Sequence, residues 1–240
     1  MRLAIISDIH GNLTALEAVI ADLKTASPDL VVQGGDLVVG GPRPAEVIDR
    51  IRELRWAGVV GNTDEVLWAP EKFEEQVERA PKLRPLLEII FHDFVATRNL
   101  IGEERMRWLQ ALPREWRNQD LLLLHASPGD LWQAPMPDCE EQRLLATYGG
   151  AGAAIVVYGH IHRPYVRQAP GFVVANSGSV GTPYDGDPRA SYLLIEDGNV
   201  AIRRVEYDVE AEIRYLLSSG YPHAAWIAEI RRHGKYVPPF

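Results

Sequence analysis

The sequence lacks several features that mark particular classes of protein. Cys139 is the one cysteine among 240 residues, so no disulfide can form within the chain, as is usual in the reducing cytoplasm. No uninterrupted apolar run approaches the length of a membrane span, and the chain enters an expected strand almost at once rather than a secretory leader. We therefore expect a cytoplasmic location and no membrane partner.

Basic residues are scarce relative to acidic ones. The chain has 25 Lys and Arg against 33 Asp and Glu, a formal net charge of −8. A broad nucleic-acid surface depends on clustered Lys and Arg, so we do not expect one here. A substrate that carries phosphate would have to be attracted locally, for instance by bound cations.

What the sequence does contain is an alternation of buried strands and amphipathic helices. Apolar runs predict strands at 3–6, 30–32, 58–60, 121–124, 153–158 and 172–175, and helical spacing predicts helices over 13–26 and 45–56. The Asp-Gly pair at 197–198 predicts a hairpin between 191–195 and 200–205. We expect one α/β domain over residues 1–240, with a helical insertion at about 65–112 and a helical C-terminal extension at about 208–240.

Polar residues follow most of the predicted strands. Those that could bind a metal are Asp8, His10, Asp36, Asn62, His125, His160 and His162. If the first of these segments is extended, Asp8 and His10 point to the same side. One such position could be a turn residue, or a buried histidine whose ring bonds to a backbone carbonyl. These ordinary roles do not explain four histidines at successive strand ends. Strand ends are also where sites form in α/β sheets.

The residue types in this set indicate which metals they would bind. Seven nitrogen and oxygen ligands are too many for one tetrahedral ion, but they suit two ions that share a carboxylate. Imidazole, carboxylate and amide without thiolate favour manganese, iron, zinc, cobalt or nickel over calcium or magnesium. Two such ions about 3.5–4 Å apart are suited to in-line displacement at phosphorus. The sequence therefore predicts two divalent transition metal ions, with manganese as the first choice.

The motifs SDIHGN, GGDL, GNTD, the lone His125, GHIH and NSGSVG resemble, in this order, those of the calcineurin-like metallophosphoesterases. The short opening motif, the GNTD variant and the small size are most similar to the bacterial and archaeal phosphodiesterase-type members. The resemblance implies a four-layer α-β-β-α sandwich with two mixed sheets. It further implies that a metal-bridging hydroxide attacks phosphorus directly, with no phospho-enzyme.

The resemblance also implies how the ligands divide between two ions. One ion would take Asp8, His10, Asp36 and His162, and the other would take Asp36, Asn62, His125 and His160. Asp36 would then bridge the two ions.

One position departs from the family pattern. Many relatives carry a histidine after the Gly-Asn pair, where it helps to protonate or position the leaving group, whereas this chain carries Thr63. A hydroxyl is a poor general acid near neutral pH. Either Thr63 only closes a turn, or leaving-group protonation is weak or comes from elsewhere. The candidate catalytic residues are Asn62, Thr63 and Asp64. Asp64 either orients a neighbouring group or caps a helix.

Three residues outside the ligand set are candidates for substrate binding. Asn12 either reaches the substrate or caps the helix that follows it. Arg43 and Arg163 are candidates by charge and location, although surface arginines are common. We expect the groups that line the approach to the site to come from residues 65–99 and from the C-terminal helices.

The function predicted from these patterns is metal-dependent hydrolysis of small phosphate esters, diesters rather than monoesters. Two alternatives stay open. One is a phosphomonoesterase, including a protein phosphatase. The other is a metal-binding regulatory scaffold with little turnover. Thr63 in place of the histidine is evidence for this alternative, and the complete ligand set is evidence against it. Ligand chemistry fixes where phosphorus binds, but not which groups are attached to it.

Overall fold

The structure, a computed structural model, describes residues 1–239 except for the side chain of Leu83. Its strands are β1 (Arg2–Ile6), β2 (Leu30–Gln33), β3 (Ala57–Gly58), β4 (Glu115–Asn118), β5 (Leu121–Leu124), β6 (Ile155–Tyr158), β7 (Tyr165–Ala169), β8 (Phe172–Asn176), β9 (Ala190–Glu196) and β10 (Asn199–Val205). Its helices are α1 (Leu13–Ala26), α2 (Pro44–Glu53), α3 (Asn62–Val66), α4 (Glu71–Arg79), the 3-10 helix η1 (Pro81–Leu83), α5 (Arg84–Gln110), α6 (Glu141–Tyr148), α7 (Val209–Ser218) and α8 (Ala224–His233).

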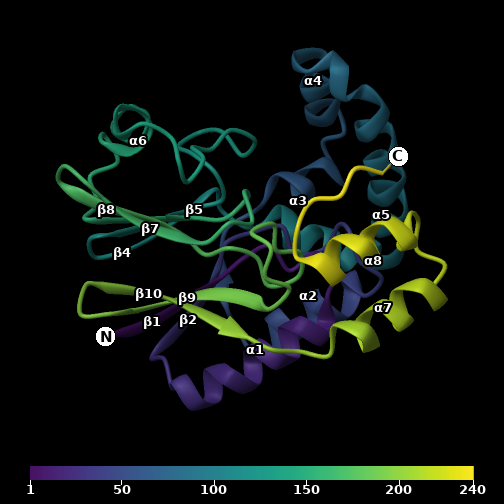
Figure 1. The fold of residues 1–240 in the computed structure, drawn as a ribbon, viewed down its shortest axis with the longest axis horizontal. Helices are drawn as coiled ribbons and strands as arrows, with labels where there is room; N and C mark the ends of the chain where they lie inside the picture. Colours follow the sequence, from purple (N-terminus) through teal and green to yellow (C-terminus); the bar gives the residue numbers. More distant parts are fainter. Residues whose placement is uncertain (240) are drawn as a thin grey trace.

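The strands form two five-stranded mixed sheets (Figure 1). The first has the order β10-β9-β1-β2-β3 and the second the order β4-β5-β6-β8-β7. In the first sheet β1 is parallel to β2 and antiparallel to β9. In the second sheet β5 is parallel to β6 and antiparallel to β4. This is the α/β fold with two mixed sheets that the sequence predicted.

The two sheets pack against each other, with helices on their outer faces. Leu3 and Ile5 of β1 lie in the core between the sheets with Leu121 and Leu123 of β5. Helices α1 and α2 cover the outer face of the first sheet, and α6 covers that of the second (Figure 1). Because β1 is buried on both faces from Leu3 to Ile6, its sequence there is an unbroken apolar run, and each fully buried leucine contributes about 1.5–3 kcal/mol.

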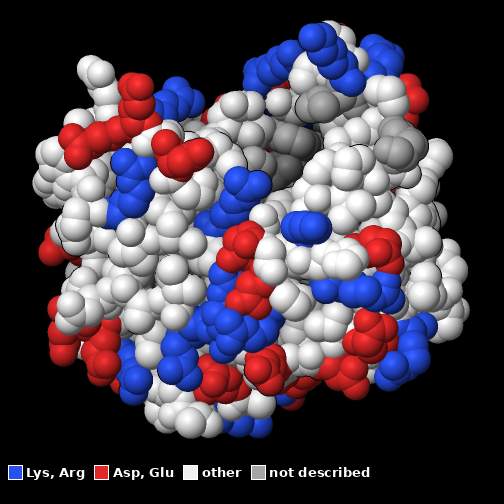
Figure 2. All heavy atoms as spheres, viewed as in Figure 1, with Lys and Arg blue, Asp and Glu red and all other residues white. Residues whose placement is uncertain are grey.

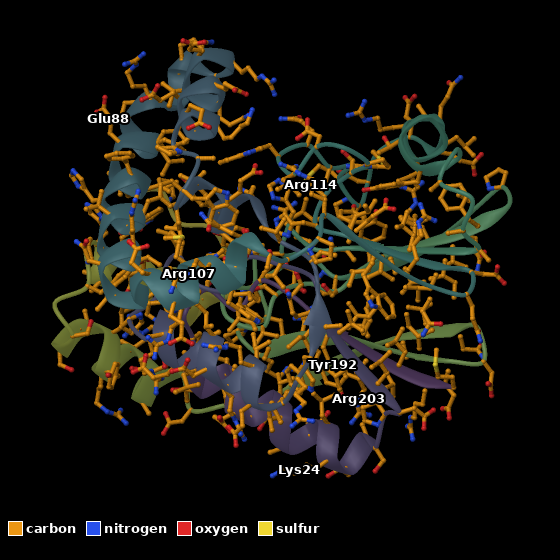
Figure 3. All side chains as sticks on the ribbon, turned by 180° about the vertical axis from the view of Figure 1, so that it is seen from behind. Lys24, Glu88, Arg107, Arg114, Tyr192 and Arg203 are labelled. Carbon is orange, nitrogen blue, oxygen red and sulfur yellow. The ribbon has the colours of Figure 1, made fainter. Side chains whose placement is uncertain are left out.

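Polar contacts fix α1 on the first sheet (Figure 3). The hydroxyl of Tyr192 on β9 donates to Oδ2 of Asp22 on α1 at 2.7 Å. Arg203 on β10 forms an ion pair with the same carboxylate at 3.3 Å. On the face drawn in Figure 2, Lys and Arg side chains lie among Asp and Glu rather than in one patch.

Two strands were not predicted from the sequence, β4 and β7. Both are edge strands of the second sheet. Strand β4 has no buried residue, and β7 has buried residues only at its two ends. Neither therefore has the apolar run by which the central strands were recognised. The third predicted strand is also shorter than expected, since β3 ends at Gly58.

Helices occupy the two segments where the sequence predicted a helical insertion and a helical extension. The insertion contains α4, η1 and α5, and the extension contains α7 and α8. The long helix α5 is interrupted at Gly102, where φ is 70° and ψ is 172°. These helices gather beside the sheets at one end of the molecule (Figure 1). Within residues 1–239, no helix combines the length and the apolar character needed to cross a membrane.

Candidate metal centre

All seven predicted ligands lie close together at strand ends. Asp8 and His10 follow β1, Asp36 follows β2, Asn62 begins α3, His125 follows β5, and His160 and His162 follow β6. Six of the seven side chains are buried, and His160 is half-buried. The two sheets therefore bring residues up to 154 positions apart into one site.

Four of these residues form a compact group. Asp8, His10, Asp36 and His162 each offer one ligand atom, and these atoms all lie within 4.8 Å of one another. Nε2 of His10 is 3.1 Å from Nε2 of His162. Nε2 of His162 is 3.3 Å from Oδ1 of Asp8, and Nε2 of His10 is 3.7 Å from Oδ2 of Asp36. This group could hold a metal ion.

A second group lies on the other side of Asp36. Oδ1 of Asn62 is 2.8 Å from Nε2 of His125 and 3.0 Å from Nδ1 of His160. Oδ1 of Asp36 is 3.5 Å from Nε2 of His125. One oxygen of Asp36 thus faces the first group, and its other oxygen faces the second.

Each histidine of the cluster is held by a backbone carbonyl. Nδ1 of His10 lies 2.5 Å from the carbonyl of Val39, Nδ1 of His162 lies 2.5 Å from that of Thr182, Nδ1 of His125 lies 2.8 Å from that of Gly34, and Nε2 of His160 lies 3.0 Å from that of Trp132. A carbonyl only accepts, so these nitrogens carry the proton, and the other ring nitrogen offers a lone pair. In the neutral imidazoles, these lone pairs point at one another and at the carboxylates. They repel one another unless cations lie among them.

The backbone reaches this geometry by turns rather than by extension. Asp8, His10, Asp36, His160 and His162 have φ values of 56°, 49°, 54°, 66° and 56°, in the left-handed region. The expectation that Asp8 and His10 converge because their segment is extended is therefore wrong. Their amides instead donate to the loop after β2, Asp8 to the carbonyl of Gly35 at 3.0 Å and His10 to that of Asp36 at 3.1 Å. These bonds between the two loops hold the conformations in place.

The Gly-rich segment after β8 packs directly under the first loop. The hydroxyl of Ser179 donates to the carbonyl of Asp8 at 2.6 Å, and the amide of Val180 donates to that of Ser7 at 3.0 Å. A Cβ at Gly181 would overlap the carbonyl of Ile9, so this position must be glycine.

At Asp8, His10 and His160 the electrostatics favour the protonation states that metal ligation needs, whereas at His162 the effect of burial is outweighed by that of Asp8, which raises the pKa of this imidazole. Burial raises the pKa of Asp8. His162, His125 and His10 together lower it by more, so the pKa of Asp8 is lowered overall. Burial and the neighbouring His162 lower the pKa of His10. Burial and the neighbouring His125 lower the pKa of His160 to about 4. At neutral pH Asp8 is therefore ionised, and His10 and His160 are neutral.

The structure gives the other two catalytic candidates different surroundings. Asp64 is fully buried and accepts from the amides of Leu37 at 3.0 Å and Gly61 at 3.2 Å, so it caps α3 and anchors the loop after Asp36. Burial, with the nearby charge of Asp36, raises the pKa of Asp64 to about 7. Thr63 donates its amide to Oδ1 of Asp36 at 2.9 Å. Its buried hydroxyl has no hydrogen-bond partner in the described part of the chain.

The three candidate substrate contacts separate into different places. Asn12 is buried and caps α1, with Oδ1 accepting from the amide of Ala15 at 3.0 Å, as one of its two readings predicted. Arg43 forms an ion pair with Glu212 of α7, so its guanidinium is engaged by the C-terminal extension. Arg163 is exposed and lines a surface cleft with Tyr184 and Lys235. Of the three, only Arg163 is exposed and directly follows a predicted ligand, His162, in the chain.

A cavity of about 140 Å³ adjoins the first group of ligands. His10, His162 and Thr63 line it, and α5 and α8 supply further parts of its wall. Ile90 on α5 and Trp226 on α8 are part of that wall. The insertion and the C-terminal helices therefore line the approach, as the sequence predicted. The sequence did not indicate which of their residues would do so.

The comparisons with known proteins agree over most of the chain. The family model described as a calcineurin-like phosphoesterase superfamily domain matches residues 1–199. An uncharacterised protein from Methanocaldococcus jannaschii is 28% identical, with 95% of this chain and 96% of that protein covered. Phosphodiesterase YfcE from Escherichia coli is 26% identical, with 84% of this chain and 91% of that protein covered.

Solved structures extend the agreement to the helices at the end of the chain. A metallophosphoesterase from Sphaerobacter thermophilus has a TM-score of 0.80 at 26% identity, with 98% of this chain and 99% of that chain covered. A hypothetical protein from Pyrococcus horikoshii has a TM-score of 0.83 at 20% identity, with the same coverage, and shares the fold. The motifs, the fold and the family model agree, and the chain belongs to the calcineurin-like phosphoesterase superfamily.

Proposed function

We propose that this protein is a dinuclear metal-dependent phosphoesterase that hydrolyses small phosphate diesters in preference to monoesters. The observation that carries the proposal is the position of Asp36, whose two oxygens face two separate groups of nitrogen and oxygen ligands. A carboxylate in this position suits a bridge between two cations.

The proposed ligands of the two ions follow from the two groups. The first ion takes Asp8, His10, Asp36 and His162, and the second takes Asp36, Asn62, His125 and His160. Their donor atoms fit transition metals, because all are imidazole nitrogens or oxygens and each histidine directs its second ring nitrogen into the cluster. Manganese is the ion that we favour. When bound, a pair of such ions lowers the pKa of a water towards about 7 and holds phosphate oxygens.

The protein's own contribution is to fix these ligands before substrate arrives. The carbonyls of Val39, Thr182 and Gly34 orient three imidazoles, and the amide of Thr63 holds one oxygen of Asp36. Burial keeps bulk water away from the ligand atoms, which strengthens their interaction with charge. Rigid ligands that lose little freedom on binding are what a tight metal site requires.

A diester is favoured as substrate because the relative from Escherichia coli is named a phosphodiesterase. The cavity beside the first ligand group, with several apolar residues in its wall, gives room for an organic substituent on the phosphate. Arg163 is the proposed contact for a substrate oxygen at the mouth of the site, because it follows His162 and is exposed.

The test is turnover of bis(p-nitrophenyl) phosphate against p-nitrophenyl phosphate by protein stripped of metal and reloaded with manganese, nickel, zinc or cobalt. We expect a higher kcat/KM for the diester, and loss of activity in Asp36→Asn. The matched control is Asp120→Asn, which removes an exposed carboxylate in a different cleft, beside Met1. Faster turnover of the monoester would indicate a phosphomonoesterase. No turnover with any metal would indicate a binding scaffold.

A further inference from the structure

The cavity next to the ligand cluster has one buried acid in its wall. Asp93 on α5 is 3% exposed and lines the cavity with Ile227 and Ile230 of α8. Thr63 lines the same cavity. A carboxyl group in this position is costly to bury, and the ligand set described above does not use it.

The side chain of Asp93 has one polar contact in the described part of the chain. Its Oδ1 lies 3.3 Å from Nδ1 of His223, the residue before α8. The side chain of His223 is 28% exposed, whereas that of Asp93 is 5% exposed. The pair therefore connects the cavity wall to solvent through an imidazole, the side chain that most readily exchanges protons near neutral pH.

We propose that the leaving group of the ester occupies this cavity, and that Asp93 is the general acid that protonates the leaving oxygen. This inference rests on the proposed phosphoesterase function. It assigns to Asp93 the role for which Thr63 is unsuited, since a threonine hydroxyl is too weak an acid. His223 is then a positioning residue that holds the carboxyl and passes protons to it from solvent.

The proposed hydrolysis moves one proton from Asp93 to the leaving oxygen. The oxygen of a water forms a bond to phosphorus, and that water gives up a proton to solvent. The bond between phosphorus and the leaving oxygen breaks, and its electron pair stays on the leaving oxygen. That oxygen takes the proton of the Asp93 carboxyl and departs as an alcohol. The resulting carboxylate regains a proton from solvent through His223.

The surroundings of Asp93 keep its carboxyl protonated at neutral pH. Burial raises the pKa of Asp93 to about 8. The titratable groups around it are His92 on the same helix, His223 and Tyr221 before α8, and His10, His162 and Tyr184 across the cavity. The hydroxyl of Tyr221 donates to the backbone carbonyl of Asp93 at 3.3 Å, which fixes this turn of α5.

The experiment compares two diesters that differ in their need for protonation. Asp93→Asn keeps the size of the side chain but removes the proton. On diphenyl phosphate, whose leaving group is poor, kcat should fall by about 10²–10⁴-fold. On bis(p-nitrophenyl) phosphate the loss should be at least about tenfold smaller, because nitrophenolate leaves without a proton. The alkaline limb of the kcat–pH profile for diphenyl phosphate should also disappear.

Matched variants separate this role from a structural one. Glu88→Gln makes the same change to an exposed carboxylate on the same helix and should leave both activities unchanged (Figure 3). His223→Gln should lower kcat on diphenyl phosphate and move the alkaline limb, with KM unchanged. The manganese stoichiometry and the thermal midpoint are measured for each variant. If Asp93→Asn does not fold, the kcat and pH profile of His223→Gln test the proposal instead.

Equal losses of kcat on the two diesters, or an unchanged pH profile, would overturn the role of Asp93 while leaving the phosphoesterase intact. Wild-type protein that hydrolyses neither diester with any metal would overturn the proposed function, and this inference with it.

Discussion

At the residue scale, the site depends on backbone conformations that most side chains avoid. Five of the seven predicted ligands have positive φ, a conformation that costs about 1–3 kcal/mol for each such residue. The candidate ligands could be selected from the sequence because imidazoles and carboxylates after buried strands are conspicuous there. Their conformations could not be predicted, because they depend on the loop of the neighbouring strand, which accepts the amides of Asp8 and His10.

The contact between Gly61 and Asp36 provides a test at this scale. A Cβ on Gly61 would overlap Oδ1 and the amide nitrogen of Asp36. We therefore expect Gly61→Ala to displace the carboxylate and to weaken manganese binding by about 10–100-fold, measured by isothermal titration calorimetry. The matched control is Gly150→Ala, where a Cβ would meet nothing within 4 Å. Equal affinity in the two variants would contradict the position of Asp36.

Asp93 predicts how the stability of the metal-free protein depends on pH. Its pKa is raised to about 8 in the folded protein, against about 3.9 in the unfolded chain. Between these values the folded state holds a proton that the unfolded state has released. The contribution of Asp93 to stability is therefore complete below about pH 4 and is lost as pH rises towards about 8, by up to roughly 1.4 kcal/mol per pH unit.

The measurement is urea denaturation of the metal-free protein from pH 5 to pH 9. We expect Asp93→Asn to flatten the decline in the free energy of unfolding relative to wild type, and Glu88→Gln to leave it unchanged. A parallel decline in Asp93→Asn would mean that Asp93 is already ionised in the folded protein.

At the element scale, the C-terminal helix α8 is tied to the ligand loop by a buried arginine. Arg231 is fully buried, and its guanidinium donates to the carbonyls of His10 at 3.0 Å and Gly40 at 3.1 Å. It also donates to Oε1 of Glu212 on α7 at 2.7 Å. The sequence predicted that this part of the chain is helical. The docking of the two helices could not be predicted, because Arg231 and His10 are 221 positions apart and no local pattern connects them.

Removal of this arginine should destabilise the whole fold. Arg231→Met leaves the buried carboxylate of Glu212 without one partner and the carbonyl of His10 without a donor. We expect a loss of about 3–5 kcal/mol in the free energy of unfolding, measured by urea denaturation. The matched control is Arg232→Met, whose ion pair with Glu210 is exposed and is expected to be worth less than about 1 kcal/mol. Similar losses in the two variants would contradict the role of Arg231.

At the scale of the whole molecule, the site is assembled from parts that fold from different kinds of sequence signal. The central strands were recognisable because both of their faces are buried, and the ligands were recognisable because they follow those strands. The edge strands β4 and β7 and the wall formed by α5 and α8 were not placed, because exposure and long-range packing leave little trace in a local pattern. The candidate ligands could thus be identified from the sequence, whereas the cavity beside them required the structure.

The central claim is that two metal ions share Asp36, and anomalous X-ray scattering from crystals soaked in manganese chloride tests it most directly. We predict two anomalous peaks about 3.5–4 Å apart, one on each side of the Asp36 carboxylate, with Asn62 and His125 bound to the second. A single peak, or two peaks away from Asp36, would contradict the account.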